Sequence, residues 1–406
     1  MYAPLENLDP NQTWTIEDLN RLKAIQLLPS IIYFSLISIV GVIGNICVII
    51  IFFYRFSPTI HRYFILVLAS YDLVASAIGG PFMVTESVFA FEYHDEVSCK
   101  IARLMFYFTC IASCLTLVLI SIERHRKICL PLKKQFTLTH AKWAVFILSG
   151  VFSIISAIPA GILFGNSSVD TGIPSVIGTK CFIKDIYTGE NLIFPVLHTM
   201  YLVVLAIIAT FIMCFCYTQV ARQVAKTGKA NIEDRNKCND NEVATEAEGT
   251  VDLDMSNDSM GLENGKDKEL ASKSSAISLS GVTGNQDGKE PKIKTQQKKP
   301  KLLHVAKPFV TSSYDRKTLR ITKILTTVTI AFCVSYIPHQ SLMLLQLFIA
   351  HDDNGLLPTD NLYRIMFYGC SFNNMLNPFI YAAMDLKFRA ELKDLLTCQF
   401  KFVKQI

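Results

Sequence analysis

Residues 24–54 read AIQLLPSIIYFSLISIVGVIGNICVIIIFFY, a run of about 31 positions without a charged side chain. A helix needs about 20 consecutive apolar residues to cross the hydrocarbon core of a bilayer. Six further runs follow, of which one is interrupted, by Asp72 alone. They lie between Arg62 and Glu86, Arg103 and Glu123, Lys142 and Asp170, Glu190 and Arg222, Lys323 and Asp352, and Arg364 and Asp385. Seven runs in series predict an all-α membrane protein, a seven-transmembrane helix bundle.

The composition of the 406-residue chain agrees with this reading. Hydrophobic residues make up 51% of it and charged residues only 18%, whereas a soluble protein is about one-quarter charged. A soluble globular protein is therefore excluded, and we expect no nucleic-acid partner. No short charged-then-apolar segment with a cleavage site precedes the first run, so we expect the first span itself to direct insertion.

Basic residues concentrate in alternate short loops, which sets the orientation of the bundle. The cytoplasmic side of a membrane protein carries the excess of Lys and Arg in such loops. The clusters comprise Arg55 and Arg62, then Arg124, Arg126, Lys127, Lys133 and Lys134, and finally Lys387, Arg389 and Lys393. We therefore predict a multi-pass plasma-membrane protein with an extracellular N-terminus and a cytoplasmic C-terminus.

This topology divides the chain into five segments. Residues 1–28 form an extracellular segment, 29–225 helices one to five, 226–316 the third cytoplasmic loop, 317–384 helices six and seven, and 385–406 an amphipathic eighth helix and tail. The third loop is too polar to offset its ordering entropy, so we predict disorder there; its Ser and Thr residues are either phosphorylation sites or part of a passive tether. The eighth helix would lie on the membrane surface, with Cys398 beyond it as a palmitoylation site or an inert thiol.

The cysteines test the topology independently. Of 12 cysteines, only Cys99 and Cys181 fall on the outer, oxidising side of the predicted bundle. We predict a disulfide between them, with two unrelated free thiols as the alternative. Two glycosylation triplets, which begin at Asn11 and Asn166, also fall on the outer side.

Asp72 is the most informative residue inside the spans, because an ionisable group deep in a bilayer is expensive and usually functional. A lone buried carboxylate either takes a proton or finds a cation and hydrogen-bond donors. Oxygen ligands for a small hard cation are available nearby in the predicted bundle. The candidate partners are Asn45, Ser113, Asn373, Asn374 and Asn377.

A second group of residues indicates a two-state element. Glu123 and Arg124 stand at the cytoplasmic end of the third span, where they pair with each other or release the Arg toward a docked partner. By itself this pair is also typical of ordinary snorkelling side chains. Pro338 and Pro378 each remove a backbone hydrogen bond in mid-span and create points about which a helix bends.

The ordered set of motifs resembles the rhodopsin-like G-protein-coupled receptors, and in particular those for neuropeptides. The motifs are Gly44-Asn45, Leu68-Ala69-Ser70-Tyr71-Asp72, Cys99 about 25 residues before Arg124, Trp143, Phe332, Pro338, and Asn377-Pro378-Phe379-Ile380-Tyr381. The resemblance implies a receptor and not an enzyme. It implies no cofactor except an allosteric sodium ion, held by Asp72, Ser113, Asn373 and Asn377.

Partners and switch residues are implied by the same resemblance. An extracellular ligand would drive the sixth helix outward, so that Arg124 engages a heterotrimeric G protein; arrestin, receptor kinases and membrane lipid are further partners. The implied switch residues are Glu123, Arg124, Tyr217, Pro338, Asn377, Pro378 and Tyr381. Departures from the family pattern are Glu123, His125, Ala209, Ser335, Tyr336 and Asn374.

Two positions in the spans restrict the chemical class of the ligand. Phe106 stands where amine receptors have an Asp, and Ser371 where opsins carry a retinal-binding Lys, so an amine is disfavoured and retinal is excluded. The mixed polar residues of the outer side favour a peptide; a lipid or amine receptor and a seven-span transporter remain alternatives. The predicted pocket residues are Phe106, Tyr107, Tyr201, Tyr336, His339, Gln340, Met343 and Phe367.

Overall fold

The computed structural model describes residues 13–173, 176–248, 316–349 and 361–399. The glycosylation triplet at Asn11 and most of the third cytoplasmic loop lie outside these ranges. The chain forms two compact units, one of residues 1–228 with 314–406 and one of residues 229–313. The helical bundle described below is the first unit.

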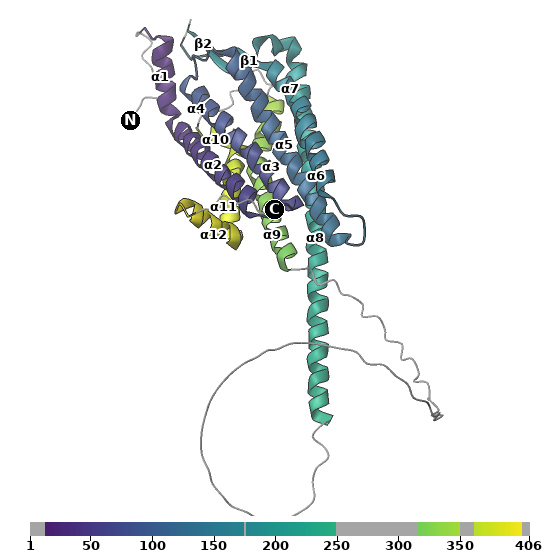
Figure 1. Ribbon diagram of the computed structural model, residues 1–406. Coiled ribbons are helices and arrows are strands. Elements are labelled where there is room, and N and C mark those ends of the chain that lie inside the picture. Colours follow the sequence, from purple (N-terminus) through teal and green to yellow (C-terminus); the bar gives the residue numbers. More distant parts are fainter. Residues whose placement is uncertain (1–12, 174–175, 249–315, 350–360, 400–406) are drawn as a thin grey trace, which may run out of the picture. The chain divides into compact units, whose positions relative to one another are not determined.

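The bundle consists of long helices packed side by side (Figure 1). Its first part contains α1 (Ile16–Gln26), α2 (Leu28–Arg55), α3 (Ile60–Val74), η2 (Ala75–Gly79), α4 (Gly80–Val88), α5 (Glu96–Cys129), α6 (Leu138–Ala144), η3 (Val145–Phe152) and α7 (Ser153–Leu163). The remaining elements are β1 (Phe164–Asp170), β2 (Ile177–Ile183), η4 (Asp185–Tyr187), η5 (Gly189–Leu192), α8 (Ile193–Glu248), α9 (Arg316–Ile349), α10 (Asn361–Phe367), α11 (Cys370–Met384) and α12 (Leu386–Leu396).

Six helices in the described part of the chain are long and apolar enough to cross a membrane. The seventh predicted span is present as two successive helices, α10 and α11, because the α-helical pattern breaks at Tyr368 and Gly369. Tighter bonds continue the backbone there, from the Ser371 amide to the Tyr368 carbonyl (2.9 Å) and from the Phe372 amide to the Gly369 carbonyl (3.1 Å). Large apolar side chains such as Ile43, Phe146 and Phe211 are exposed on the bundle surface, as lipid-facing residues require.

The second and fourth spans each contain a π-helical stretch, η2 and η3 respectively. In η2 the widened turn brings the carbonyl of Ser76 within 2.8 Å of the Ser38 hydroxyl on α2. Gly80 follows, and a Cβ atom there would lie 2.4 Å from the Ser38 Cβ. The absence of a side chain at Gly80 therefore permits the close approach of α2 and α4.

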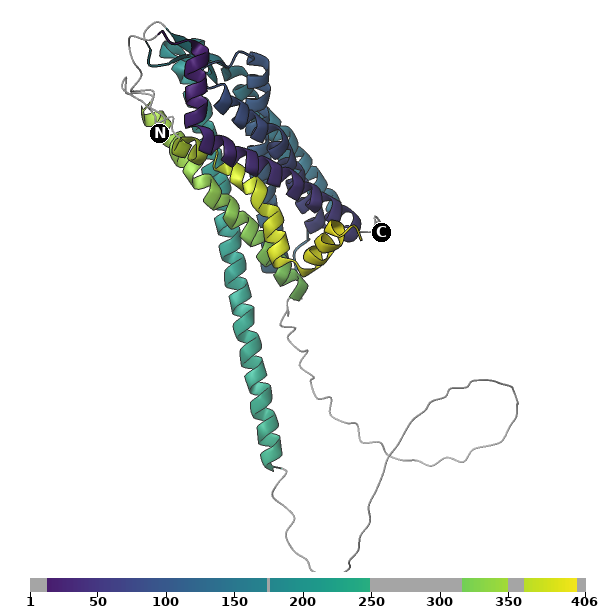
Figure 2. The same ribbon diagram turned by 90° about the vertical axis from the view of Figure 1, so that its left-hand side faces the viewer.

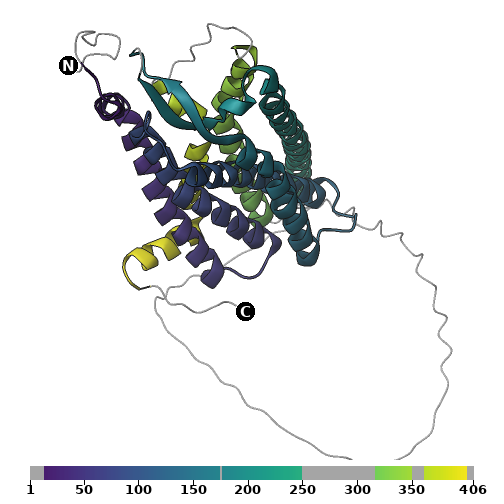
Figure 3. The ribbon, with the colours of Figure 1, turned by 90° about the horizontal axis from the view of Figure 1, so that it is seen from above.

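One end of the bundle, which the sequence predicts to be the outer end, carries an antiparallel hairpin of β1 and β2 (Figure 3). Cys181 on β2 forms a disulfide with Cys99 in the first turn of α5, with the Cα atoms 5.6 Å apart. The predicted Cys99–Cys181 pair is confirmed. The hairpin was not predicted from the sequence.

Helix α1 was also not predicted. Thr15 caps it, since its hydroxyl accepts from the Asp18 amide while the Asp18 side chain accepts in return. The Asn20 side chain donates to the Val88 carbonyl (3.0 Å) and accepts from the Phe91 amide (3.0 Å), which ties α1 to the end of α4. Figure 2 shows α1 at the outer end of α2 and α12 beyond the inner end of α11.

Helix α12 follows α11 after a single residue, Asp385, whose carboxylate caps it. Phe388 is buried against Phe52 and Tyr381, and Glu391 pairs with Arg55 at 2.6 Å. These contacts fix α12 against α2 and α11. Its predicted position on a membrane surface stays a prediction, as does palmitoylation of the exposed thiol of Cys398.

Helix α8 extends through residues 226–248, where the sequence predicted disorder. This stretch contains no proline and ends before Gly249. It also contains Gly228 and several Asn and Asp residues, which are poor helix formers, so helix propensity alone does not explain the continuation. The prediction of disorder for residues 226–248 is wrong, because a polar stretch that lacks a core can still be helical.

We expect removal of the disulfide to destabilise the outer end of the bundle. Cys99→Ser and Cys181→Ser should each lower the free energy of unfolding by about 2–4 kcal/mol, because the bond closes a long loop. The double variant should be no less stable than either single variant, since both remove the same bond. Thermal unfolding of the purified protein in detergent measures this; additive losses would contradict the prediction, and Cys398→Ser is the control.

Candidate functional site

Two adjoining cavities open between the helices at the outer end of the bundle. The larger has an empty volume of about 880 Å³, part of it open to solvent, and the smaller about 520 Å³. Tyr107 and Met343 line both. The larger cavity is bounded by side chains from α4, α5, α8, α9 and α10 and from the β hairpin, many of them aromatic or charged. Its size is typical of a ligand-binding pocket.

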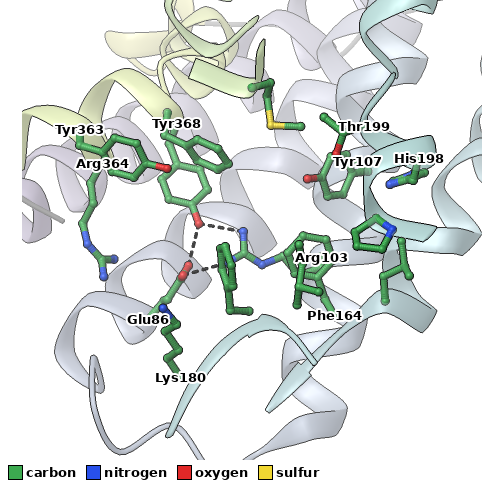
Figure 4. Close-up of a pocket in the computed structure, with 16 residues that line it drawn as sticks. Glu86, Arg103, Tyr107, Phe164, Lys180, His198, Thr199, Tyr363, Arg364 and Tyr368 are labelled. Carbon is green, nitrogen blue, oxygen red and sulfur yellow. Dashed lines mark hydrogen bonds and ion pairs between the residues drawn. The ribbon is translucent and has the colours of Figure 1, made fainter. Parts of the chain in front are cut away.

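A buried charged cluster forms one wall of the larger cavity (Figure 4). The Arg103 guanidinium, whose side chain is 3% exposed, donates to Glu86 Oε1 at 2.8 Å and to the Tyr368 hydroxyl at 2.8 Å. Tyr368 in turn donates to Glu86 Oε2 at 2.8 Å. Arg103 also donates to the Cys181 carbonyl at 3.2 Å, so this cluster connects α4, α5, the break before α11 and the hairpin.

Aromatic rings complete the surroundings of Arg103. Its guanidinium carbon lies 5.2 Å from the ring centre of Phe82 and 5.0 Å from that of Phe164, within the range of cation–π attraction. The sequence reasoning missed Arg103, which it treated only as the boundary of a span. Its position four residues after Cys99 places both on one face of α5, which was the available signal.

Six of the eight predicted pocket residues line these cavities. They are Tyr107, Tyr336, His339, Gln340, Met343 and Phe367. His339 lies at the junction, because its ring nitrogen Nδ1 is 2.5 Å from the Phe367 carbonyl and its ring centre is 6.1 Å from that of Tyr336. Below it, Tyr336 stacks on Phe332 at 4.2 Å between ring centres.

The other two predicted pocket residues lie elsewhere. The Tyr201 hydroxyl is 2.7 Å from the Ser156 hydroxyl on α7. The helical phase explains this, since α8 lines the cavities through His198, Leu202 and their neighbours, and Tyr201 lies on the adjoining face. Phe106 packs edge-on against Tyr368 at 5.7 Å, behind the cavities.

Of the polar residues predicted around Asp72, Ser113 and Asn377 contact it. The buried Asp72 carboxylate accepts from Asn377 Nδ2 at 2.5 Å and lies 3.5 Å from the Ser113 hydroxyl. Among the described residues, the Oδ1 atoms of Asn373, Asn377 and Asn45 are buried without a hydrogen-bond partner. The Asn45 amide donates to the Asn374 carbonyl at 2.8 Å, which joins α2 to α11.

The inner end of the bundle holds the predicted switch residues in a closed arrangement. Arg124, 1% exposed, forms an ion pair with Glu123. The Tyr217 hydroxyl lies 3.1 Å from the Thr329 hydroxyl, which links α8 to α9. Tyr381 is buried against Phe52. Pro338 and Pro378 lie inside α9 and α11 respectively, as predicted.

The outer hairpin holds Asn166, the remaining predicted glycosylation site. Its Nδ2 donates to the His94 carbonyl at 2.9 Å. The next two residues, Ser167 and Ser168, both donate through their hydroxyls to Asp185 at 2.8 Å. These hydrogen bonds, chiefly that of Ser168, lower the pKa of Asp185, so its carboxylate is charged at neutral pH.

Comparisons with known proteins identify the family of this chain. A model of the 7 transmembrane receptor (rhodopsin family) matches residues 44–381. The chain is 31% identical over 140 residues to the neuromedin U receptor homolog nmur-2 of Caenorhabditis elegans, an alignment that covers 33% of this chain and only 34% of that receptor. It is 23% identical to the thyrotropin-releasing hormone receptor of Gallus gallus, with 92% of this chain and 79% of that receptor covered.

A third relative, the muscarinic acetylcholine receptor M2 of Gallus gallus, is 23% identical, with 93% of this chain and 94% of that receptor covered. The family is one of multi-pass membrane receptors, so it agrees with the expectation that the chain is not an enzyme. The family match spans more than half of the chain and includes Asn45, Asp72, Arg124, Pro378 and Tyr381. The chain belongs to the rhodopsin family of seven-transmembrane receptors.

Proposed function

We propose that this receptor binds an extracellular peptide in the outer cavities and activates a heterotrimeric G protein at its inner end. The observation that carries the proposal is the pairing of an open cavity of about 880 Å³ at one end with a closed Glu123–Arg124 ion pair at the other. A ligand that favours the open inner state shifts the equilibrium by its difference in affinity for the two states. The disulfide and the hairpin mark the outer end, and the N-terminus is then extracellular.

Tyr336 and its neighbours on α9 connect the outer cavities to the inner part of the bundle. Tyr336 lines the smaller cavity and stacks on Phe332, and it packs against both the outer and the inner buried apolar clusters. Pro338 is two residues above Tyr336 and weakens α9 there. A ligand that displaces Tyr336 would therefore bend α9 and move its inner end outward, away from Tyr217 and Arg124.

A peptide fits the outer cavities better than the alternatives do. Two of the relatives are named for neuromedin U and thyrotropin-releasing hormone, and the larger cavity presents acidic, basic and aromatic groups together. The muscarinic relative is named for acetylcholine, but Phe106 stands where the amine receptors carry their Asp. The smaller, more apolar cavity is the feature that favours a non-peptide ligand such as a lipid.

We also propose a sodium site at Asp72. The residues fit the ion, because a buried carboxylate is contacted by the Ser113 hydroxyl and by Asn377, whose amide oxygen has no partner among the described residues. The buried amide oxygen of Asn373, one turn before Asn377 on α11, is likewise without a partner there. Bound sodium would supply the positive charge that keeps Asp72 ionised. Arrestin and receptor kinases belong to the same proposal as partners of the inner face, and membrane lipid as the partner of α12 and Cys398.

The Arg124→Ala variant tests the signalling proposal. Cells that express the receptor with promiscuous G proteins are screened against a synthetic neuropeptide library, and the active peptide is then applied to purified receptor and G protein. We expect the wild type to accelerate nucleotide exchange and Arg124→Ala to reduce it to the receptor-free level, because the variant lacks the guanidinium that engages the G protein.

Lys142→Ala, which changes an exposed basic residue on α6, is the matched control and should signal normally. Full exchange by Arg124→Ala would contradict the proposal. A response to small-molecule libraries in place of peptides would support the non-peptide alternative.

The Asp72→Asn variant tests the sodium proposal. In sodium chloride the melting temperature of the wild type should exceed that in choline chloride of equal ionic strength by about 2–4 °C, because the ion binds only the folded state. Asp72→Asn should melt at the same temperature in both salts. Equal melting temperatures for the wild type in the two salts would contradict the sodium proposal.

A further inference from the structure

The larger outer cavity carries an unbalanced positive charge. Its charged lining residues in the described part of the chain are Glu86, Arg103, Lys180 and Arg364, one acid and three bases. They come from four different elements, α4, α5, β2 and α10. In Figure 4, Glu86, Lys180 and Arg364 gather at one end of the cavity, with His198 and Thr199 at the other.

Glu86 is hydrogen-bonded to other residues of the cavity wall. One carboxylate oxygen accepts from Arg103 and the other from the Tyr368 hydroxyl, each at 2.8 Å, and within the described part of the chain Glu86 forms no hydrogen bond with Lys180 or Arg364. Arg103 and Glu86 thus form a self-neutral pair inside the wall. Their charges cancel, which leaves the charge of the two other bases facing the cavity.

Lys180 and Arg364 make only weak contacts of their own. The Lys180 ammonium lies 4.7 Å from the ring centre of Phe182, and the Arg364 guanidinium lies 3.3 Å from the Ser87 hydroxyl. Neither forms an ion pair with an acid among the residues that the structure describes. The Asp185 carboxylate attracts Lys180 at longer range, and it accepts hydrogen bonds from the hydroxyls of Ser167 and Ser168.

Burial raises the electrostatic cost of the positive charges of Lys180 and Arg364. Both side chains are half-buried. Loss of water lowers the pKa of Lys180, the Glu86 carboxylate opposes this shift, the positive charge of Arg364 adds to it, and the Asp185 carboxylate opposes it again. Two partly dehydrated cations that form no ion pair within the described part of the chain remain incompletely neutralised. An anion brought by a ligand would remove the repulsion and supply hydrogen-bond acceptors.

We propose that Lys180 and Arg364 bind a carboxylate of the peptide ligand, either its carboxyl terminus or an acidic side chain. The inference rests on the proposed peptide-receptor function and names the ligand group that the outer cavity selects. Arg364 supplies a planar, two-pronged donor and Lys180 a compact charge. The rings of Phe164, Phe182 and Phe367 along the same wall suit an aromatic or aliphatic residue beside that carboxylate.

The experiment measures binding of small probes to the purified full-length receptor, so it needs neither a known agonist nor a G protein. The probes are N-acetyl-phenylalanine, its amide, and N-acetyl-glutamyl-phenylalanine amide, which carries an acid only on its side chain. Binding is followed by ligand-observed NMR. We expect the carboxylates to bind about tenfold more tightly than the amide, and the two acids together distinguish a terminal from a side-chain carboxylate.

Two substitutions locate the site. Lys180→Met and Arg364→Met should each weaken carboxylate binding about tenfold and leave amide binding unchanged, because each removes one charge while keeping most of the apolar stem. Lys184→Met is the matched control, because Lys184 directly follows β2 and does not line the cavity. Melting temperatures verify that all variants fold.

The inference is overturned if the wild type binds acid and amide equally, if it binds neither acid, or if Lys184→Met has the same effect as Lys180→Met. The first of these comparisons uses only the wild type, so it holds even where a variant fails to fold. These outcomes are independent of the nucleotide-exchange assay, and failure of one proposal is therefore distinguishable from failure of the other.

Discussion

A polar or charged side chain inside a membrane bundle must find its partner within the protein, because lipid offers none. This constraint is met at three depths of the described bundle. At the outer end Arg103 is neutralised by Glu86 and Tyr368. In the middle Asp72 gathers Ser113 and Asn377, and at the inner end Arg124 pairs with Glu123. The outer and middle groups join residues that are distant in the sequence, so they also hold helices together, whereas Glu123 and Arg124 are neighbours on α5.

None of the three arrangements satisfies every polar atom. The Glu86 carboxylate uses both of its oxygens, but Arg103 Nε is buried without a hydrogen-bond partner among the described residues, as are the amide oxygens of Asn373 and Asn377 and one nitrogen of Arg124. A partly bonded network leaves room for a second arrangement. Each of the three groups can therefore accommodate a change of state.

The sequence predicted most of the fold because hydrocarbon thickness sets helix length and because basic residues mark one side of the membrane. It also predicted the contacts of Asp72 with Ser113 and Asn377, since an isolated buried carboxylate demands partners. It failed where the answer depended on rotation about a helix axis, as for Tyr201, or on packing between distant segments, as for Arg103 and Tyr368. Helix α1 and the break at Gly369 were missed for a related reason, because local hydrogen bonds and not hydrophobicity define them.

Two cross-links of different chemistry hold the outer end of α5. Cys99 joins the hairpin covalently, and Arg103, one turn further along, joins the same hairpin strand, α4 and the start of α11 through hydrogen bonds. A stiff rod that is fixed at one end is displaced most at the opposite end. The 34-residue helix α5 is therefore held most firmly near the ligand cavity, and these two cross-links restrain it least at its opposite end, where Arg124 lies.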